Sequence, residues 1–444
     1  MRKKIFIAVV GIIGVLSIAT LAVSQMDRSI KDDLFTQIEL FSYALTTVKT
    51  EYVDDIKPKD LIYGSLRGLL SSLDPHSQFM DPEEYKELKT ETEGKFGGLG
   101  IEISVKDGLL TIITPIEDTP AWRAGVKAGD RIVKIGDELT RDMTLNDAVK
   151  RLRGEPNTKV TITVLRESDS KILEFTITRE IIHIQDVKNV QILKDKIGYI
   201  RLTEFREESA KEFRKGIEQL KAQGADSLIL DLRNNPGGLL NVAIDITEQF
   251  LPEGQTIVST KGRRESQNSV AISANKDHVI DWPTVVMINQ GSASGSEILA
   301  GALKDNKRAV LLGTKSFGKG SVQSVIPMPD GSGLRLTTAK YFTPSGVSIH
   351  EKGIIPDVVV DRIYPKKDDE DTKKKDPNEK DVDEVFDNVK KNTKTAVPVP
   401  ETDPVKKHEA EVKEELLKDN QIQSAINVLN GIKVYKKFEP EVKR

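Results

Sequence analysis

Cysteine is missing from the 444-residue chain, and histidine occurs only five times. The absence of cysteine excludes disulfide bonds, a cysteine nucleophile and metal sites built from thiolates. The histidines show no metal-ligand spacing such as HExxH and lie in no motif typical of a Ser-His-Asp triad, although counting alone does not exclude such a triad. The sequence therefore predicts no metal and no cofactor.

An excess of charge of one sign is missing as well, because 66 Lys and Arg residues face 69 Asp and Glu residues. A protein that binds nucleic acid through its phosphates needs a strongly basic surface, so the overall charge predicts no nucleic-acid partner. The length of the chain allows two or three domains.

The N-terminus combines positive charge with an apolar run. Arg2, Lys3 and Lys4 precede an uncharged, mostly apolar stretch from Ile5 to Ser24. About twenty such residues are just enough to span a bilayer, and small residues near the end of the stretch are compatible with cleavage. We expect residues 1–24 to be a signal peptide or membrane anchor that exports the chain across the inner membrane into the periplasm, with the basic end cytoplasmic.

The stretch from Val286 to Gln323 organises the rest of the chain. A buried strand is predicted just before a Gly- and Ser-rich turn, followed by a helix from about Ser294 to Asp305, a second strand, and a Gly-rich turn that holds Lys319. A serine at a strand-to-helix turn is well placed as a nucleophile, because the helix N-terminus offers N–H groups to an oxyanion. A lysine can act as its base if burial lowers the lysine pKa.

Two other interpretations of these residues remain open at this point. Ser294 and Glu297 form a capping-box pattern, which occurs at many helices without any catalytic role. The segment from Gly313 to Lys319 begins like a phosphate-binding loop, but that motif needs Ser or Thr next and this chain has Gly320. A nucleotide site is therefore disfavoured.

The segments GSASGSEI and SFGKGSVQ resemble the active-site signature of the C-terminal processing peptidases, serine proteases of the S41 type. The resemblance implies Ser294 as nucleophile, Lys319 as general base and Gln323 as the residue that orients the lysine. The usual motif has Ala where this chain has Gly295, and this change keeps the backbone N–H. The resemblance also implies a multidomain α/β fold with a crotonase-like core of the ClpP/crotonase type.

Residues 25–94 read as an N-terminal helical module. Apolar residues recur at three- and four-residue steps along its first helix, as expected of one buried stripe. A second helix and a third that begins near Pro82 are predicted to follow. In the resembling peptidases this part packs beside the core and helps the protein to dimerise. The stripe consists of Leu34, Ile38, Phe41, Leu45, Val48 and Tyr52.

Residues 95–180 resemble a PDZ domain, with FGGLGIEISV, then AGVKAGDRIVKIGD, then a helix near residues 145–152 and two alternating strands. The resemblance implies a loop whose N–H groups receive the terminal carboxylate of a peptide, followed by a strand to which an extended peptide adds. The loop residues are Gly97, Gly98, Leu99 and Gly100, and the strand residues are Ile101 and Ile103.

Residues 181–364 are predicted to form the catalytic core. The run SLILDL reads as a buried strand that leads into RNNPGG, and the two glycines precede an apolar helix. In the S41 family this loop helps to make the oxyanion hole. The resemblance therefore assigns Gly237 or Gly238, together with Gly295, to that role. The repeated strand–helix units predict a layered α/β core.

The composition changes abruptly after Tyr364. Residues 365–404 are charged and nearly free of apolar side chains, which predicts a flexible linker. Residues 405–444 are predicted to hold a single helix from about Val405 to Asn430. Its apolar side needs a partner, either the core of the same chain or another subunit, and consists of Val412, Leu416, Ile422, Ile426 and Leu429.

Together these observations predict an exported serine endopeptidase that cleaves proteins near their C-termini through an acyl-enzyme. The expected partners are proteins or peptides with free C-termini, a second copy bound through the N- and C-terminal helices, and the membrane if the N-terminal segment is uncleaved. Two alternatives remain. A PDZ adaptor with an inactive core predicts no acylation of Ser294, and a crotonase-like acyl-thioester enzyme predicts coenzyme A binding.

Overall fold

The computed structural model describes residues 33–106, 108–116, 118–141, 143–166, 171–276, 280–363, 394–395 and 405–438. The chain divides into two compact units, one formed by Met1–Pro82 with Val325–Leu336 and the other by Glu83–Ser324 with Thr337–Arg444. The predicted signal or anchor and nearly all of the predicted linker lie outside the described residues. Within those residues no helix combines the length and the apolar character that crossing a membrane requires.

The first unit is built around two helical segments and a short strand. Residues 33–51 are helical, and α2 (Pro58–Ser71) follows, then β1 (Gln78–Met80). Tyr63 of α2 packs edge-on against Phe79 of β1, with ring centroids 4.7 Å apart. β1 pairs antiparallel with the start of β18 (Gly333–Phe342), which together with β17 (Ser321–Pro327) contributes to both units.

The apolar stripe predicted along the first helix is present, and most of it is exposed. Its residues Leu34, Ile38 and Phe41 are about half exposed or more within the chain. An apolar stripe on a helix that its own chain leaves uncovered marks a surface that another body can cover.

The PDZ part of the second unit is a small, mostly antiparallel sheet with short helices, preceded by α3 and joined to the core through the separate strand pair β2-β9. Its strands follow the order β20-β8-β7-β5-β4-β3, β6 pairs with β5, and β3 forms one edge. The predicted helix at residues 145–152 is α5, and its N-terminus carries a capping box between Thr144 and Asp147. The elements are α3 (Pro82–Glu93), β2 (Lys95–Gly98), β3 (Ile101–Lys106), β4 (Leu109–Pro115), α4 (Pro120–Arg123), β5 (Arg131–Ile135), β6 (Glu138–Leu139), α5 (Leu145–Leu152), β7 (Lys159–Arg166), β8 (Lys171–Thr178), β9 (Glu180–His183) and β20 (Lys394–Thr395).

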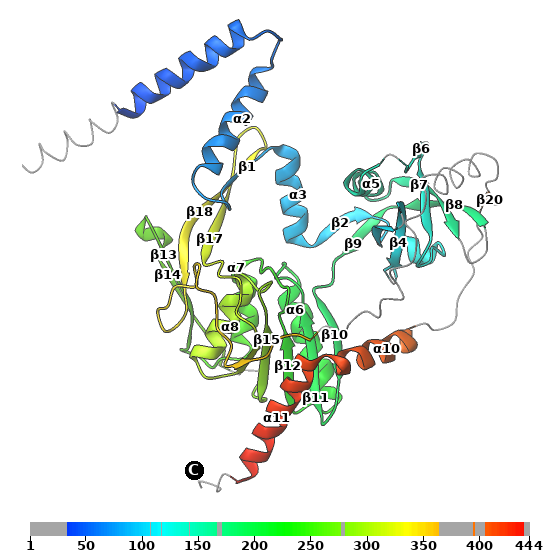
Figure 1. The fold of residues 1–444 in the computed structure, drawn as a ribbon, viewed down its shortest axis with the longest axis vertical. Helices are drawn as coiled ribbons and strands as arrows, with labels where there is room; N and C mark the ends of the chain where they lie inside the picture. Colours follow the sequence, from blue (N-terminus) through cyan, green and yellow to red (C-terminus); the bar gives the residue numbers. More distant parts are fainter. Residues whose placement is uncertain are drawn as a thin grey trace, which may run out of the picture. The chain divides into compact units, whose positions relative to one another are not determined.

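The core of the second unit is a six-stranded sheet in the order β10-β11-β12-β15-β16-β19, drawn in green to yellow in Figure 1. All neighbouring strands are parallel except β10, which runs antiparallel to β11. Parallel neighbours need crossover connections, and here helices provide most of them. The elements are β10 (Val187–Ile192), β11 (Ile197–Leu202), α6 (Ser209–Ala222), β12 (Ser227–Asp231), α7 (Leu240–Glu248), β15 (Thr284–Ile288), α8 (Gly295–Asp305), β16 (Val310–Gly313) and β19 (Val358–Val359).

Alternating side chains of this sheet enter two separate apolar cores. In a strand successive side chains point to opposite faces, and the sheet strands follow this rule. Leu228, Leu230 and Val286 pack with α6, α7 and α8, whereas Ile229 and Val285 pack with the C-terminal helix α11 (Asn420–Phe438). Helices therefore cover both faces of the sheet, as expected of a mostly parallel sheet.

A smaller antiparallel sheet completes the second unit. β13 (Thr256–Gly262) pairs with β14 (Ser269–Ile272) on one side and with the end of β18 on the other. A short 3-10 turn, η2 (Glu265–Gln267), joins β13 to β14. β17, which carries Gln323, pairs with β18.

The C-terminal segment corrects one prediction and answers another. The single helix expected between Val405 and Asn430 is two helices, α10 (Val405–Lys418) and α11, separated at Asp419. The carboxylate of Asp419 accepts the N–H of Gln421 at 2.9 Å, so this residue caps the second helix. Ile422, Ile426 and Leu429 are buried on the sheet of the same chain. The apolar side of this helix therefore has its partner in the core of the same chain, and its predicted part in a dimer stays a prediction.

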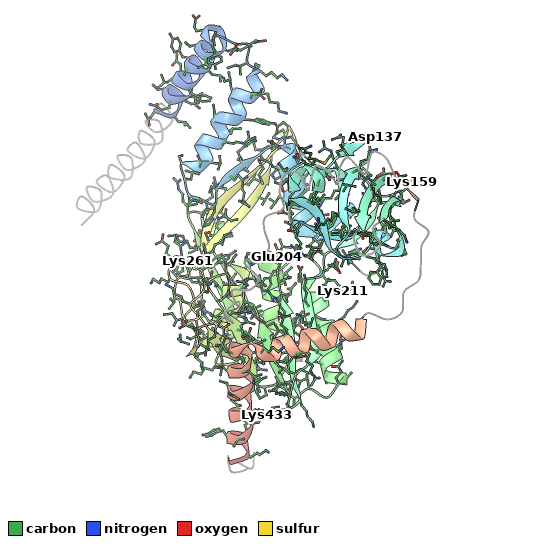
Figure 2. All side chains as sticks on the ribbon, turned by 45° about the vertical axis from the view of Figure 1, so that its right-hand side comes forward. Asp137, Lys159, Glu204, Lys211, Lys261 and Lys433 are labelled. Carbon is green, nitrogen blue, oxygen red and sulfur yellow. The ribbon has the colours of Figure 1, made fainter. Side chains whose placement is uncertain are left out.

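A polar contact supports the far end of α11. Lys433, labelled in Figure 2, donates to the carbonyl oxygen of Asp195 at 2.6 Å and forms an ion pair with Asp226. Both acceptors lie near the amino ends of β11 and β12. The helix is therefore held along its length by apolar contacts and near its end by a lysine.

We predict that Ile422→Ala lowers the free energy of unfolding by about 2–5 kcal/mol, because a fully buried isoleucine leaves a cavity when it is truncated. Val434→Ala on the same helix is the control, since Val434 is 52% exposed, and it should change stability by no more than about 0.5 kcal/mol. Denaturant unfolding measures both. Equal effects of the two substitutions would show that α11 is not packed on the sheet.

Candidate active site

Three neighbouring parallel strands bring the predicted site residues to one edge of the core sheet. β12 leads into the loop with Gly237 and Gly238, β15 leads into the turn with Ser294, and β16 leads into the loop with Lys319. Because β12, β15 and β16 are adjacent and parallel, their carboxyl ends lie side by side. Ligands of open α/β sheets bind at this edge. The order of the strands therefore brings together loops that are distant in the sequence. The first and last predicted site residues in these loops, Gly237 and Lys319, are 82 positions apart.

Ser294 lies at a sharp turn between β15 and α8. Its φ is +50° and its ψ is −111°, a conformation that residues other than glycine rarely adopt. Such backbone strain persists only where the surroundings fix it. Here the N–H of Ser294 donates to Glu297 Oε2 at 3.0 Å, and the N–H of the preceding Ala293 donates to the carbonyl oxygen of Asn235 at 3.0 Å.

Glu297 connects the serine turn to the lysine loop. Its side chain is fully buried and accepts four hydrogen bonds. Oε2 accepts the N–H groups of Ser294 at 3.0 Å and Lys319 at 2.9 Å. Oε1 accepts the N–H of Gly318 at 2.7 Å and the hydroxyl of Ser316 at 2.6 Å. One carboxylate oxygen thus holds the backbones of Ser294 and Lys319 next to each other.

The electrostatics of Glu297 follow from this environment. Burial raises the pKa of Glu297 above its ordinary value, because an ionised carboxylate loses its hydration, and the four hydrogen bonds oppose that rise. All four partners are donors, so the geometry is that of an acceptor-only, ionised carboxylate.

Lys319 and Gln323 occupy the loop after β16 and the strand that follows it. Lys319 is half-buried, and Gln323 lies on β17. The Nε2 group of Gln323 donates to Thr337 Oγ1 at 2.8 Å. The Oε1 atom of Gln323 is buried and has no hydrogen-bond partner within the described residues. An acceptor at this position is therefore available to a donor that moves or binds there.

The glycine loop after β12 approaches the serine turn closely. Gly237 has φ +101°, and a Cβ atom there would lie 2.7 Å from Gly295 N and from Ser294 Cβ. At Gly238, with φ +144°, a Cβ atom would lie 2.3 Å from the carbonyl oxygen of Phe205. Only glycine allows both contacts.

The two glycines differ in what their N–H groups do. The N–H of Gly237 donates to Asn235 Oδ1 at 2.9 Å. In the described part of the chain, no hydrogen bond from the N–H of Gly238 or Gly295 to a protein acceptor is present. Of the alternatives left open by the sequence, Gly238 is therefore the better candidate donor, beside Gly295 at the first position of α8.

Two serine side chains that are not catalytic candidates fasten the glycine loop to the serine turn, and an asparagine fastens the loop to β11. Ser292 Oγ donates to the carbonyl oxygen of Leu232 at 2.8 Å, and Ser296 Oγ donates to that of Asn235 at 2.9 Å. Asn235 Nδ2 in turn donates to the carbonyl oxygen of Leu202 at 2.9 Å. The two loops therefore form one hydrogen-bonded body.

The predicted peptide-binding residues separate into two groups. Gly97 and Gly98 belong to β2, which pairs with β9, so they are not part of an open loop as predicted. Leu99 and Gly100 form the turn before β3. Ile101 and Ile103 lie on β3 and pack against the apolar cluster that includes Ala148 and Leu152 of α5.

Sequence reasoning assigned two of the connecting residues no functional role. Glu297 was visible only as part of a capping-box pattern, and nothing in the local sequence links it to the lysine loop. Asn235 was visible only as part of RNNPGG. The sequence signal for Glu297 was the S-x-x-E spacing itself. In a capping box the glutamate side chain accepts the backbone N–H of the serine, and Glu297 forms this hydrogen bond with Ser294. Among the described residues, no cluster of three or more potential metal ligands is present.

Three parts of the chain match known protein families. Residues 196–360 match peptidase family S41, residues 111–166 match a PDZ domain, and residues 16–84 match the N-terminal domain of the activating protease CtpB.

Individual relatives are similar over most of the chain. A carboxy-terminal-processing protease of Bartonella bacilliformis is 42% identical over 83% of this chain and 85% of its own length. A carboxyl-terminal-processing protease of Synechocystis is 42% identical over 69% of this chain and 73% of its own. Among solved structures, a photosystem II D1 C-terminal processing protease is 32% identical, with a TM-score of 0.42, over 72% of this chain and 86% of its own.

We predict that Glu297→Gln abolishes most activity and lowers stability. The amide would place a donor against N–H groups that need an acceptor, and a buried unsatisfied donor costs about 1–3 kcal/mol. Glu253→Gln, at an exposed position, makes the same chemical change and should leave kcat and melting temperature unaltered. Peptide turnover and thermal melting test both variants. Wild-type turnover by Glu297→Gln would show that its carboxylate does not organise the site.

Proposed function

The chain belongs to peptidase family S41 and is a carboxyl-terminal processing serine protease, and we propose that Ser294 is its nucleophile and Lys319 its general base. The observation that carries the assignment is the shared oxygen of Glu297, which holds the backbones of both residues. The relatives named as processing proteases favour this function over an inactive adaptor or an acyl-thioester enzyme.

The proposed reaction proceeds through an acyl-enzyme. Neutral Lys319 Nζ takes the proton of Ser294 Oγ while that oxygen attacks the scissile carbonyl, and the collapse of the tetrahedral intermediate passes the proton to the leaving amine. Water then attacks the ester by the same route and releases the new C-terminus. The backbone strain at Ser294 sets the direction in which its side chain leaves the turn.

In this proposal Gly238 and Gly295 supply the oxyanion hole. Their N–H groups are preorganised by the glycine loop and by the first turn of α8, where the helix dipole also favours negative charge. Such donors stabilise the transition state without any reorganisation during the reaction.

Gln323 is the proposed positioning residue for the lysine. Thr337 holds its Nε2 group, which leaves the buried Oε1 as the acceptor toward an amine. An amide acceptor orients Nζ without adding a negative charge, so it does not raise the lysine pKa as strongly as a carboxylate would.

The PDZ domain is proposed to select substrates by their free C-termini. β3 is an edge strand of its sheet, so an extended peptide can add to it through main-chain hydrogen bonds. The turn at Leu99 and Gly100 would receive the carboxylate, and Ile101 and Ile103 would pair with the last residues of the substrate.

Three further features belong to the proposal. The basic start and apolar run of residues 1–24 support export to the periplasm, with the segment serving as signal or anchor. The exposed apolar stripe on residues 33–51 supports a homodimer formed by a second copy. The mostly parallel sheet covered by helices is compatible with a crotonase-type core.

We predict that Ser294→Ala and Lys319→Ala each lower kcat by at least about 10⁴-fold, because removing either member of a catalytic unit costs nearly as much as removing both. Gln323→Ala should give a smaller loss. The control is Lys315→Ala, which removes an exposed lysine from the same loop and should keep full turnover. Substantial turnover by purified Ser294→Ala or Lys319→Ala would refute the pair.

We predict that a peptide with a free C-terminus is cleaved with a kcat/KM about tenfold or more above that of its amidated form. A charge-assisted hydrogen bond contributes about 1.5–3 kcal/mol, and 1.4 kcal/mol corresponds to a factor of ten. A peptide that loses one internal carboxylate instead controls for net charge. Equal cleavage of the free and amidated peptides at sub-saturating concentration would rule out carboxylate selection.

A further inference from the structure

We propose that Asp419 and Gln421, at the start of the C-terminal helix α11, are positioning residues that hold the active-site loop in place through Arg233. The inference rests on the proposed function, because the loop concerned carries the proposed oxyanion donor Gly238. It gives the C-terminal segment a role in the chemical step that its apolar packing does not require.

Arg233 stands two residues beyond the end of β12 and is nearly fully buried. Its Nε donates to Asp231 Oδ1 at 2.9 Å, and its Nη2 donates to Asp231 Oδ2 at 2.6 Å. Tyr199 donates its hydroxyl to the same Oδ2 at 2.8 Å. Burial alone would raise the pKa of Asp231, but the bonds and charge of Arg233 outweigh it and lower that pKa. The pair is therefore ionised.

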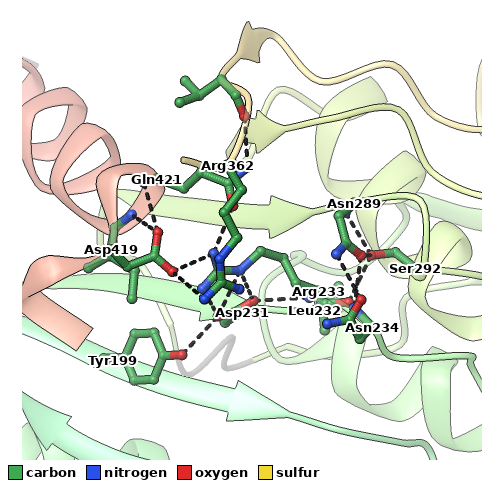
Figure 3. A network of polar contacts seen from close by, with 12 residues as sticks. Tyr199, Asp231, Leu232, Arg233, Asn234, Asn289, Ser292, Arg362, Asp419 and Gln421 are labelled. Carbon is green, nitrogen blue, oxygen red and sulfur yellow. Dashed lines mark hydrogen bonds and ion pairs between the residues drawn. The ribbon is translucent and has the colours of Figure 1, made fainter. Parts of the chain in front are cut away.

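The remaining edge of the guanidinium faces the C-terminal segment. Arg233 Nη1 donates to Asp419 Oδ2 at 2.7 Å and to Gln421 Oε1 at 2.7 Å. The Asp419 side chain is only 7% exposed. Arg362 lies 3.7 Å from the same carboxylate, so two arginines balance two aspartates. Figure 3 shows Arg233 between Asp231 on one side and the start of the red C-terminal helix on the other.

The residues on both sides of Arg233 are bonded to the serine turn. Ser292 Oγ binds the carbonyl oxygen of Leu232. Asn234 and Asn289 exchange two hydrogen bonds of 2.8 Å each, from the N–H of Asn234 and from Asn289 Nδ2. These contacts appear together on the right of Figure 3. A shift of Arg233 therefore moves its neighbours Leu232 and Asn234, which are hydrogen-bonded to the turn before Ser294.

Stability alone does not account for polar residues at this position. Four fully or nearly fully buried side chains of α11 already pack on the sheet, namely Ile422, Ala425, Ile426 and Leu429. A buried ion pair contributes little net stability compared with apolar side chains of similar size. The polar contacts of Arg233 instead fix its orientation, because a guanidinium bound along two edges can occupy only one orientation.

The test is Asp419→Asn in the full-length protein. Asparagine caps a helix as well as aspartate does, so the hydrogen bond to the N–H of Gln421 is kept while the charge facing Arg233 is lost. We expect kcat to fall about tenfold or more, since a displacement of about 1 Å in a site can cost a hundredfold. KM for a free-acid peptide should stay near the wild-type value. The melting temperature should fall, because the amide turns a donor toward the buried guanidinium of Arg233, so kcat is measured at a temperature where the variant is folded.

Two further variants control this result. Glu414→Gln removes an exposed carboxylate of α10 that is paired with Lys418 at 2.8 Å, and it should leave kcat unchanged. Asp419→Asn combined with Gln421→Glu returns a carboxylate to the same nitrogen, Arg233 Nη1, from the neighbouring position. This double variant should recover most of the lost kcat, which a general loss of stability would not do.

A measurement independent of turnover is the rate at which a fluorophosphonate probe phosphonylates Ser294 Oγ with loss of fluoride. We expect this rate to fall in Asp419→Asn and to recover in the double variant. Wild-type kcat in Asp419→Asn, or a folded double variant that recovers nothing, would overturn the positioning role. Ser294→Ala is assayed alongside. If that variant is inactive while Asp419→Asn is normal, only the present inference fails. If Ser294→Ala is active, the proposed nucleophile is wrong.

Discussion

The arrangement of the active site depends on one buried carboxylate. Glu297 is the acceptor for four donors that come from the serine turn and from the loop after β16. In a low-dielectric interior each of these bonds is strong, and each donor would be costly to leave unpaired. No neutral side chain offers two equivalent acceptor oxygens with so many lone pairs. The carboxylate thereby fixes the spacing between the serine turn and the lysine loop, whose side chains meet in the proposed proton transfer.

The parallel sheet makes this convergence possible. Because neighbouring strands end at one edge, three loops distant in sequence meet there without any long excursion of the chain. The two faces of the same sheet contact different helices. One face packs against α6, α7 and α8, of which α8 begins at the serine turn, and the other packs against α11. The proposed selection of substrates involves a different element, the edge strand β3 of the PDZ sheet.

Local sequence was enough to predict most elements, whereas the candidate catalytic residues came from the resemblance of two short segments to the S41 signature. Strong periodicity and turn residues located α5, α6, α8 and the strands before them, because each of these signals is contained within a few neighbouring residues. Contacts between distant residues were not predictable. The helical pattern of the sequence continues through Asp419. The break between α10 and α11 at this residue was not predictable, because the sequence does not reveal that Asp419 binds Arg233.

The glycine loop illustrates the same limit on a smaller scale. The sequence identifies Gly237 and Gly238 as residues that allow close approach, but it cannot say which N–H group is already engaged. That distinction comes from Asn235, whose side chain folds back onto Gly237. In the PDZ domain, Gly97 and Gly98 match a loop motif, whereas pairing with β9 makes them part of a strand. In both cases a tertiary partner decides the role of a locally ambiguous residue.

The docking of α11 has a consequence for the order of folding during synthesis. Synthesis and the proposed export both deliver the chain from its N-terminus, so the sheet strands between Ile197 and Val359 are available before residues 420–438. Until then one face of the sheet, including Tyr199, Val285 and Met287, lacks the helix that covers it. The core therefore completes its burial only when residues 420–438 have followed, and a chain truncated before α11 presents an apolar surface to chaperones and degradative proteases.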